Sequence, residues 1–430
     1  MKKTILGAVA ALLCSAVFAE MDLAGGTLTF VNKLDIEPVL YTKNRTNSDL
    51  DGIHFSGIYN TSEITFKTDL IDLYIESEMY IANRFGRNSS NTSYAHAGKT
   101  YNYGRFSCVL NNYAITIKPF EKVWFGISDE MYTKGSYLPV SDSNVDSGAL
   151  GTDGFTVLYM PVEGLKITVV LPDRVVSYIY NFGYDCFGYI DKDGKYTDKT
   201  RSVVNSGVEY TYDESLCLAF IVNDLFFNKS HYNGGSNKNP DYKPYYKTKL
   251  GFYASFDAKK WLGQNLTVNT GYTFMADRKY DLFDEGWLPD YAVGFSNYAV
   301  DLLSASVEWK NEKFNFAAQG QFRLTKSEYA KDKGYEIFIP YSLAFKAGYT
   351  VNEKWLAECY LNINKYEEHY SYGEMYYIIN PCATYTYNEH HKFRAGLNYN
   401  FFTDRWNNTE QKYEDGINNF YVNFGWTYTL

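Results

Sequence analysis

The sequence has no hydrophobic run long enough to cross a membrane as a helix. Such a helix needs about 20 consecutive apolar residues, and beyond residue 19 no stretch approaches that length. The mean hydropathy of −0.37 is that of a chain rich in polar residues. These two observations exclude a membrane protein built from helices.

Cysteine is also scarce, and the 41 basic residues are outnumbered by 50 acidic ones. Of six cysteines, Cys14 lies near the N-terminus and the other five are scattered, which does not form a disulfide framework. Those five are Cys108, Cys186, Cys217, Cys359 and Cys382. No CxxC spacing predicts a metal site, and we expect no cofactor. A formal net charge of −9 argues against nucleic acid, which requires a basic surface.

The N-terminus has the pattern of a bacterial secretory signal peptide. Lys2 and Lys3 precede a short apolar run, and Val17-Phe18-Ala19 provides a small residue for cleavage. The run is too short to span a membrane. We therefore expect residues 1–19 to be removed and residues 20–430 to form a single domain, because no linker or charge block divides them.

Aromatic residues are abundant. The chain has 43 Tyr and 29 Phe against only 10 Pro. A buried Tyr needs a hydrogen-bond partner for its hydroxyl, so tyrosine suits places where one end is apolar and the other is wet. The water–membrane interface is such a place.

Apolar and polar residues alternate along much of the chain. The pattern is clearest in residues 266–274, 314–324, 393–401 and 420–430. A period of two predicts β-strands with one apolar and one polar face. The last of these segments reaches the C-terminal residue without leaving the pattern.

The connections between these strands alternate in length. We expect eight short turns, at 69–70, 119–121, 162–164, 213–215, 258–265, 310–313, 351–354 and 388–392. We expect nine long loops, at 43–52, 83–103, 133–152, 173–200, 225–245, 276–292, 325–335, 366–374 and 403–415. Three of the turns share an Asn-Glu pair, which predicts similar hairpins.

This pattern predicts about 18 antiparallel strands, or 16 if boundaries shift, beginning with a strand near residues 28–41. In lipid every backbone N–H and C=O must be paired, so a membrane sheet of this kind has to close. The predicted fold class is therefore all-β, a closed antiparallel transmembrane β-barrel whose last strand pairs with its first.

The signal peptide, alternating strands and aromatic-rich last strand resemble bacterial outer-membrane β-barrels, and porins in particular. The resemblance implies an outer-membrane location, short turns in the periplasm, long loops outside the cell, contact with lipid and, for many porins, a homotrimer. It also implies that the barrel-assembly machinery recognises the last strand through Phe424, Trp426, Tyr428 and Leu430. Tryptophans beside the short turns would form a girdle at the membrane surface. These are Trp261, Trp309 and Trp355.

The charged residues within strands fall on the polar face, which we expect to line a pore. They are Lys67, Glu76, Glu78, Lys166, Glu209, Lys249, Glu308, Arg323, Lys346, Glu358 and Arg394. Barrels of 16–18 strands leave an aqueous channel. The resulting prediction is a porin for passive diffusion of small hydrophilic solutes or ions. A long loop could narrow the pore with opposed charges, carried by Arg84, Arg87, Asp142 and Asp146.

Two other classes of protein compete with a general porin. Tyrosines in loop 173–200 favour a saccharide-selective channel or a surface adhesin that binds a ligand; they are Tyr178, Tyr180, Tyr184 and Tyr189. An enzymatic barrel would need a positioned nucleophile or acid–base pair. No GxSxG motif occurs, and the six histidines are dispersed apart from His390 and His391. We therefore expect no enzymatic activity.

Overall fold

The computed structural model describes residues 21–23, 25–43, 52–54, 57–82, 93–96, 99–102, 107–128, 154–176, 179–182, 184–190, 196–226, 248–276, 278, 298–366, 375–403, 405–407, 412–414 and 418–429. The signal peptide expected at residues 1–19 lies outside them. Among the described residues, no helix combines the length and the apolar character needed to cross a membrane.

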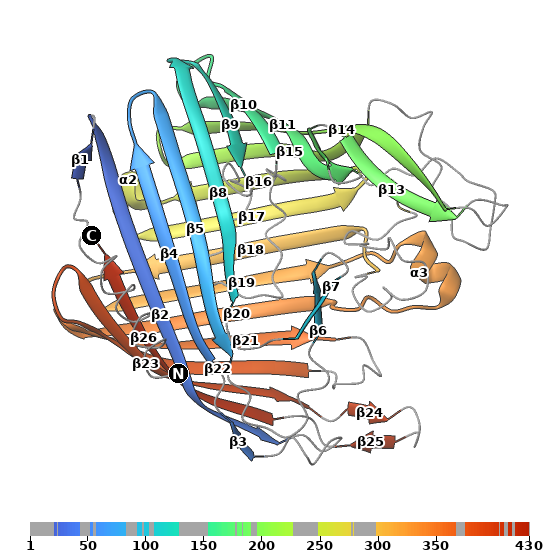
Figure 1. Cartoon of the computed structure of the whole chain (residues 1–430). Coiled ribbons are helices and arrows are strands. Elements are labelled where there is room, and N and C mark those ends of the chain that lie inside the picture. The colour runs from blue at the N-terminus through green and yellow to red at the C-terminus, as the bar shows by residue number, and fades with distance from the viewer. Residues whose placement is uncertain are drawn as a thin grey trace.

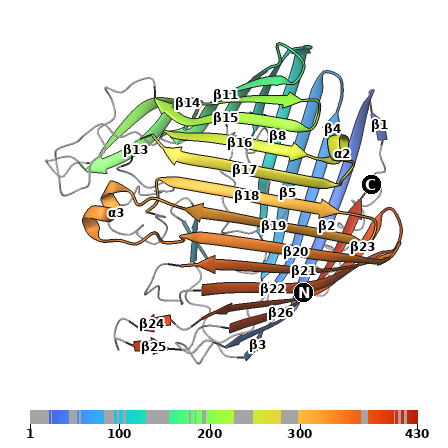
Figure 2. The same ribbon diagram turned by 180° about the vertical axis from the view of Figure 1, so that it is seen from behind.

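Antiparallel strands form one closed ring, seen from two sides in Figures 1 and 2. The ring has 18 strands, which confirms the predicted fold class and the higher of the two predicted strand numbers. The first nine are β2 (Gly26–Lys43), β4 (Gly57–Lys67), β5 (Ile71–Ala82), β8 (Ser107–Phe120), β9 (Val123–Ser128), β10 (Gly154–Tyr159), β11 (Leu165–Val176), β14 (Tyr196–Tyr212) and β15 (Leu216–Phe226). The other nine are β16 (Lys249–Asp257), β17 (Leu266–Met275), β18 (Asp301–Lys310), β19 (Phe314–Arg323), β20 (Tyr341–Asn352), β21 (Trp355–Lys365), β22 (Met375–Thr386), β23 (His391–Phe402) and β26 (Asn418–Thr429).

The ring closes where the last strand meets the first. β26 pairs with β2 from Val31 opposite Thr429 to Lys43 opposite Asn418, and its other edge pairs with β23. The expected closure is thus confirmed. The register shifts between Ile36 and Val39, around Pro38. Proline has no N–H to donate to a ladder, so a bulge at this point lets the strand continue past it.

All eight predicted short turns join neighbouring strands of the ring, and we call this side the short-turn end. Three of the turns share one hydrogen-bonding pattern, which explains their similar sequences. Asn311, Asn352 and Asn388 each accept bonds from the backbone N–H groups two and three residues later, at 2.7–3.0 Å. An Asn side chain that bonds the following backbone in this way is a common means of reversing the chain.

A polar cluster at the short-turn end joins two neighbouring turns. Asp213 and Glu214 form a tight turn with positive φ angles of 49° and 58°. The Asp213 carboxylate accepts hydrogen bonds from Lys260 and from Trp261 Nε1, the latter at 3.2 Å. Both donors lie on α2 (Lys259–Leu262), a single helical turn inside the predicted connection 258–265. These hydrogen bonds therefore link the β14–β15 turn to the β16–β17 connection through residues outside the strands.

The contribution of this cluster to stability should disappear in acid. The hydrogen bond from Lys260, followed by that from Trp261, lowers the pKa of Asp213 below its usual 3.8. Stabilisation from a lowered pKa is present above pH 3.8 and is lost as the pH falls through the folded-state pKa. We expect wild type to resist urea slightly better than Asp213→Asn at pH 7 and equally at pH 2. A difference in urea resistance between the two proteins that stays constant with pH would contradict this assignment.

Several of the predicted loops contain strands or a helix. The expectation of a loop at 173–200 is wrong, because β11 and β14 extend into it and it also contains β12 (Ile179–Phe182) and β13 (Tyr184–Ile190). The loop region 325–335 contains α3 (Glu328–Lys333), which projects with β13 from the long-loop end in Figure 2. Short hairpins occupy parts of 83–103 and 403–415. They are β6 (Ser93–His96) with β7 (Lys99–Asn102), and β24 (Arg405–Asn407) with β25 (Lys412–Glu414).

Two further short strands extend the main sheet, β1 (Met21–Leu23) against β2 and β3 (Gly52–His54) against the far end of β2. α3 is capped before its first residue by Ser327, whose hydroxyl accepts a hydrogen bond from Ala330 N at 3.0 Å, and after its last residue by Gly334, with φ of 71°. Nearby, Tyr335 packs on Tyr298 with ring centroids 5.0 Å apart. This loop is therefore held by a helix cap and by aromatic packing.

Candidate functional site: the inner face of the barrel

Side-chain exposure distinguishes the two faces of the ring. Along β20 and β26, Phe345 is 40% exposed and Phe424 is 49% exposed, whereas the neighbouring Ala344 is fully buried. The convex outer surface of a cylinder leaves side chains more accessible than the crowded concave surface does. The face that carries the exposed Ile, Leu, Val and Phe side chains is therefore the outer face, and the alternate residues form the inner face.

The strand register places all eleven predicted pore-lining residues on the inner face. Pairs such as Lys166 opposite Glu209 lie between apolar pairs such as Ile167 opposite Val208. Arg323 is 5% exposed, whereas Glu308 is open to solvent. These residues are spread around the ring, and the structure brings Lys346, Glu358 and Arg394 close to one another. The positions of the eleven agree with a pore lining, and that role stays a prediction.

Lys346, Glu358 and Arg394 meet around Tyr360. Lys346 Nζ lies 3.0 Å from Glu358 Oε1 and 5.4 Å from the centre of the Tyr360 ring. The Arg394 guanidinium carbon lies 5.8 Å from the same ring, and Arg394 Nη2 lies 3.3 Å from Cys382 Sγ. Two cations thus flank one aromatic ring, an arrangement that favours both charges.

This cluster continues across the seam where the ring closes. A β-carbon added at Gly425 would lie 2.7 Å from Asp35 Oδ1 and 3.5 Å from Arg394 Cβ. Asp35 can therefore lie over the last strand, beside Arg394, only because residue 425 is glycine. On the neighbouring strands Lys33 forms an ion pair with Glu63. Sequence reasoning missed Asp35, Lys33 and Glu63, although they share the alternation of β2 and β4.

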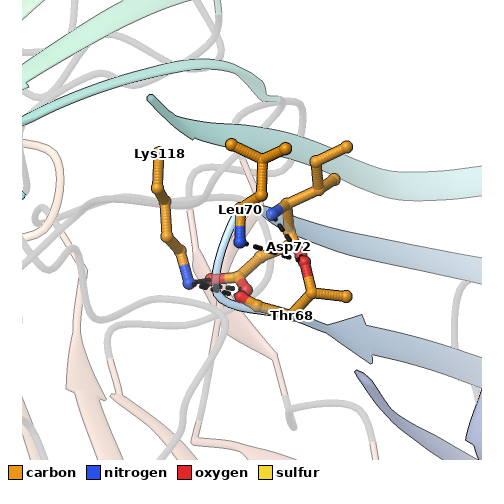
Figure 3. A network of polar contacts seen from close by, with 5 residues as sticks. Thr68, Leu70, Asp72 and Lys118 are labelled. Atoms are coloured by element: carbon orange, nitrogen blue, oxygen red, sulfur yellow. Dashed lines mark hydrogen bonds and ion pairs between the residues drawn. The ribbon is translucent and has the colours of Figure 1, made fainter. Parts of the chain in front are cut away.

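A second charged group lies on the inner face near the short-turn end. Lys118 Nζ donates to Asp72 at 2.7 Å and to the Thr68 carbonyl oxygen at 3.3 Å (Figure 3). The same ammonium lies 5.1 Å from the centre of the Trp124 ring. The hydroxyl of Thr68 accepts bonds from the N–H groups of Leu70 and Ile71, which fixes the adjoining turn. Asp72 and Lys118 were not among the predicted residues.

Amide side chains fill the inner face from β21 to β26. Each carries at least one amide atom that is shielded from solvent without a hydrogen-bond partner among the described residues. These residues are Asn362, Asn364, Asn380, Asn398, Asn400 and Asn423. Amides offer both donors and acceptors without charge, so these six residues make the wall around Glu358 and Arg394 hydrophilic without adding charge to it.

The inner face also carries apolar patches, which sequence analysis did not predict. Val170, Ala219, Ile221 and Tyr253 form a buried apolar cluster on the inner face of β11, β15 and β16. Met275, Val300 and Leu302 form a second cluster near the long-loop end. Alternation identifies which face a residue occupies, but the sequence places such residues on separate strands and so does not reveal that they gather into patches.

The C-terminal end of the last strand lies at the short-turn end, as predicted. Phe424 is exposed on the outer face, and Trp426 and Tyr428 follow at alternate positions. Trp426 Nε1 donates to His391 Nδ1 at 3.1 Å, and Thr429 N donates to the His390 carbonyl oxygen at 2.9 Å. The two histidines therefore contact the end of β26. Leu430 lies outside the described residues.

The predicted aromatic girdle residues lie beside short turns. Trp261 and Trp355 are exposed, Trp309 stacks on Phe316 at 5.8 Å, and Trp355 packs on Tyr385 at 4.8 Å. The proposed constriction residues Arg84, Arg87, Asp142 and Asp146 lie outside the described residues. So does Tyr178, and nothing is described of the side chains of Tyr180, Tyr184 and Tyr189. In the part of the chain that is described, no group of three His, Cys, Asp or Glu residues could hold a metal ion.

No protein family matches the sequence, and no curated protein matches it. Among solved structures, the chain is similar to Pseudomonas aeruginosa OccK9 (OpdG) at 9% identity and a TM-score of 0.49, over 94% of this chain and 98% of that one. Pseudomonas aeruginosa OpdQ matches at 11% identity and a TM-score of 0.45, over 94% and 97%. A triple mutant of the Rhodopseudomonas blastica porin matches at 10% identity and a TM-score of 0.39, over 94% and 100%.

Proposed function

We propose that this protein forms a water-filled channel in a bacterial outer membrane, for passive diffusion of small hydrophilic solutes or ions. The observation that supports it most directly is a closed ring of 18 strands with an apolar outer face and charged and amide residues inside. A ring of eight strands is filled by its own side chains, whereas one of 16–18 leaves room for water. Exposing so large an apolar surface to water would be unfavourable, and lipid relieves that cost.

Recording from planar lipid bilayers tests this proposal. Purified, folded protein should produce discrete conductance steps, and folding is verified beforehand by a heat-dependent change in migration on a gel. Protein that migrates as a folded barrel but produces no steps would refute the channel function. A barrel that conducts ions equally with and without candidate sugars would fit a general channel better than a saccharide-selective one.

Charge reversal on the inner face should change ion selectivity. Glu308 is exposed on the inner face of β18. Replacing Glu308 with lysine should shift the reversal potential in a salt gradient toward anion preference, because fixed charge in a narrow lumen changes the local ion concentrations. Glu353→Lys, in an exposed short turn, is the matched control and should cause a smaller shift. Equal shifts would mean that Glu308 does not face the conduction path.

We further infer that lipid contacts the outer face and that the assembly machinery engages the last strand at residues 424, 426, 428 and 430. The apolar side chains of β26 and the contacts of Trp426 with His391 support the second point, because they define an ordered end to the barrel. A homotrimer is also proposed, by resemblance alone. The protein mass of the purified particle in detergent should be three times that of one chain.

A further inference from the structure

Tyr253 lies on the inner face of β16, over two glycines. Gly251 precedes it on the same face of its own strand, and Gly271 lies directly opposite on β17. A β-carbon added at Gly251 would lie 2.7 Å from Tyr253 Cε2, and one added at Gly271 would lie 2.5 Å from Cδ1. Real β-carbons essentially never come so close to other atoms. The ring therefore occupies the space that side chains at residues 251 and 271 would fill.

Two contacts hold the ring in this orientation. The Tyr253 hydroxyl lies 2.6 Å from Thr273 Oγ1, two residues beyond Gly271 on the same face. The ring also belongs to the buried cluster with Val170, Ala219 and Ile221, and Tyr253 is only 5% exposed. A tyrosine whose hydroxyl bonds the wall and whose ring covers two wall glycines lies along the wall. It does not project across the lumen.

The orientation of an inner-face tyrosine matters to the width of a channel. A phenol ring that stands away from the wall occupies cross-section that solutes would otherwise use. Side chains at residues 251 and 271 would displace the ring. Because the backbones of β16 and β17 lie beneath the ring, we expect the displaced ring to move toward the lumen. Glycine at these two positions therefore lets a large side chain be present without narrowing the pore.

We propose that Tyr253 is a size-determining residue of the channel. Its ring can lie against the wall because Gly251 and Gly271 beneath it have no side chains. This inference rests on the proposed channel function. It predicts that the smallest solute excluded by the pore depends on whether the Tyr253 ring lies on the wall or stands in the lumen. The two glycines would then affect the width of the channel as well as the packing of the sheet.

The test compares single-channel conductance and the size of polyethylene glycol that still enters the pore. Gly271→Ala should lower the conductance and shift the exclusion limit to smaller polymers, because the added β-carbon displaces the ring. Gly271→Ala combined with Tyr253→Ala should restore at least the wild-type values, since no ring remains to displace. Gly320→Ala is the matched control. The atoms nearest to its added β-carbon belong to the side chains of Leu343 and Phe322, on the outer face.

Each outcome decides a separate point. Wild-type protein without conductance refutes the channel itself. A conducting wild type with an unchanged Gly271→Ala variant, or a double variant that stays as narrow as the single one, overturns the role of Tyr253. If Gly271→Ala fails to fold, Gly251→Ala carries the same test, because its β-carbon meets the same ring from the neighbouring position.

Discussion

Replacing Phe345 with lysine should lower the free energy of unfolding of the membrane-inserted barrel by about 2–4 kcal/mol. Phe345 lies near the middle of β20 and is 40% exposed on the outer face. Lysine at the bilayer midplane has no water to solvate its ammonium, and at mid-strand it is farthest from either surface. Urea-induced unfolding from lipid vesicles, followed by tryptophan fluorescence, measures the change.

The Phe345→Leu variant separates the effect of the added charge from the effect of losing the aromatic ring. It should lower the free energy of unfolding much less, because leucine is apolar. The neighbouring Lys346 already carries the same charge on the inner face, beside Glu358. One position along the strand thus separates a tolerated lysine from a destabilising one. If Phe345→Lys is as stable as Phe345→Leu, either the outer face does not contact lipid or the assignment of the faces is incorrect.

Truncating Asn60 to alanine should destabilise the barrel by about 1–3 kcal/mol. Asn60 and Asn32 lie on the outer face of β4 and β2, where an apolar residue is expected, and they are 3% and 8% exposed. Their amides donate to each other at 3.0 and 3.2 Å. Removing one partner leaves the Asn32 carboxamide oxygen without the donor that Asn60 supplies. The unfolding midpoint in urea should fall accordingly.

The double variant Asn32→Leu with Asn60→Leu should be close to wild type in stability. Replacing both members of a buried polar pair with apolar residues leaves neither of their amides unsatisfied. The neighbours that lose a hydrogen bond among those described are Ser62, whose hydroxyl accepts from Asn32 at 2.8 Å, and Lys33, whose carbonyl oxygen accepts from Asn60 at 3.1 Å. A double-mutant cycle with the two single leucine variants would give the coupling energy. Independent, additive effects would mean that the hydrogen bonds between the two amides contribute little to stability.

The alternation of apolar and polar residues along the chain determined most of the barrel. The side-chain period of a strand is two, so the position of each residue from Phe314 to Leu324 is enough to assign it a face. Turn chemistry is equally local, because Asn311, Asn352 and Asn388 bond backbone groups only two or three residues away. Together these short-range rules predicted the strand number, and the need to pair every backbone group in lipid predicted closure.

Only the tertiary structure decided which inner-face residues meet. Asp35 lies over Gly425, beside Arg394, because the first and last strands are neighbours and Gly425 has no side chain. Tyr253 lies on the wall because its cross-strand partner is Gly271. Both contacts depend on pairing register between strands, which alternation within one strand does not encode. The extended strands within 173–200 escaped prediction for the same reason, since β13 is defined by its pairing with β14. The sequence by itself therefore determined the cylinder and its two faces, and the register between strands determined the chemistry of its interior.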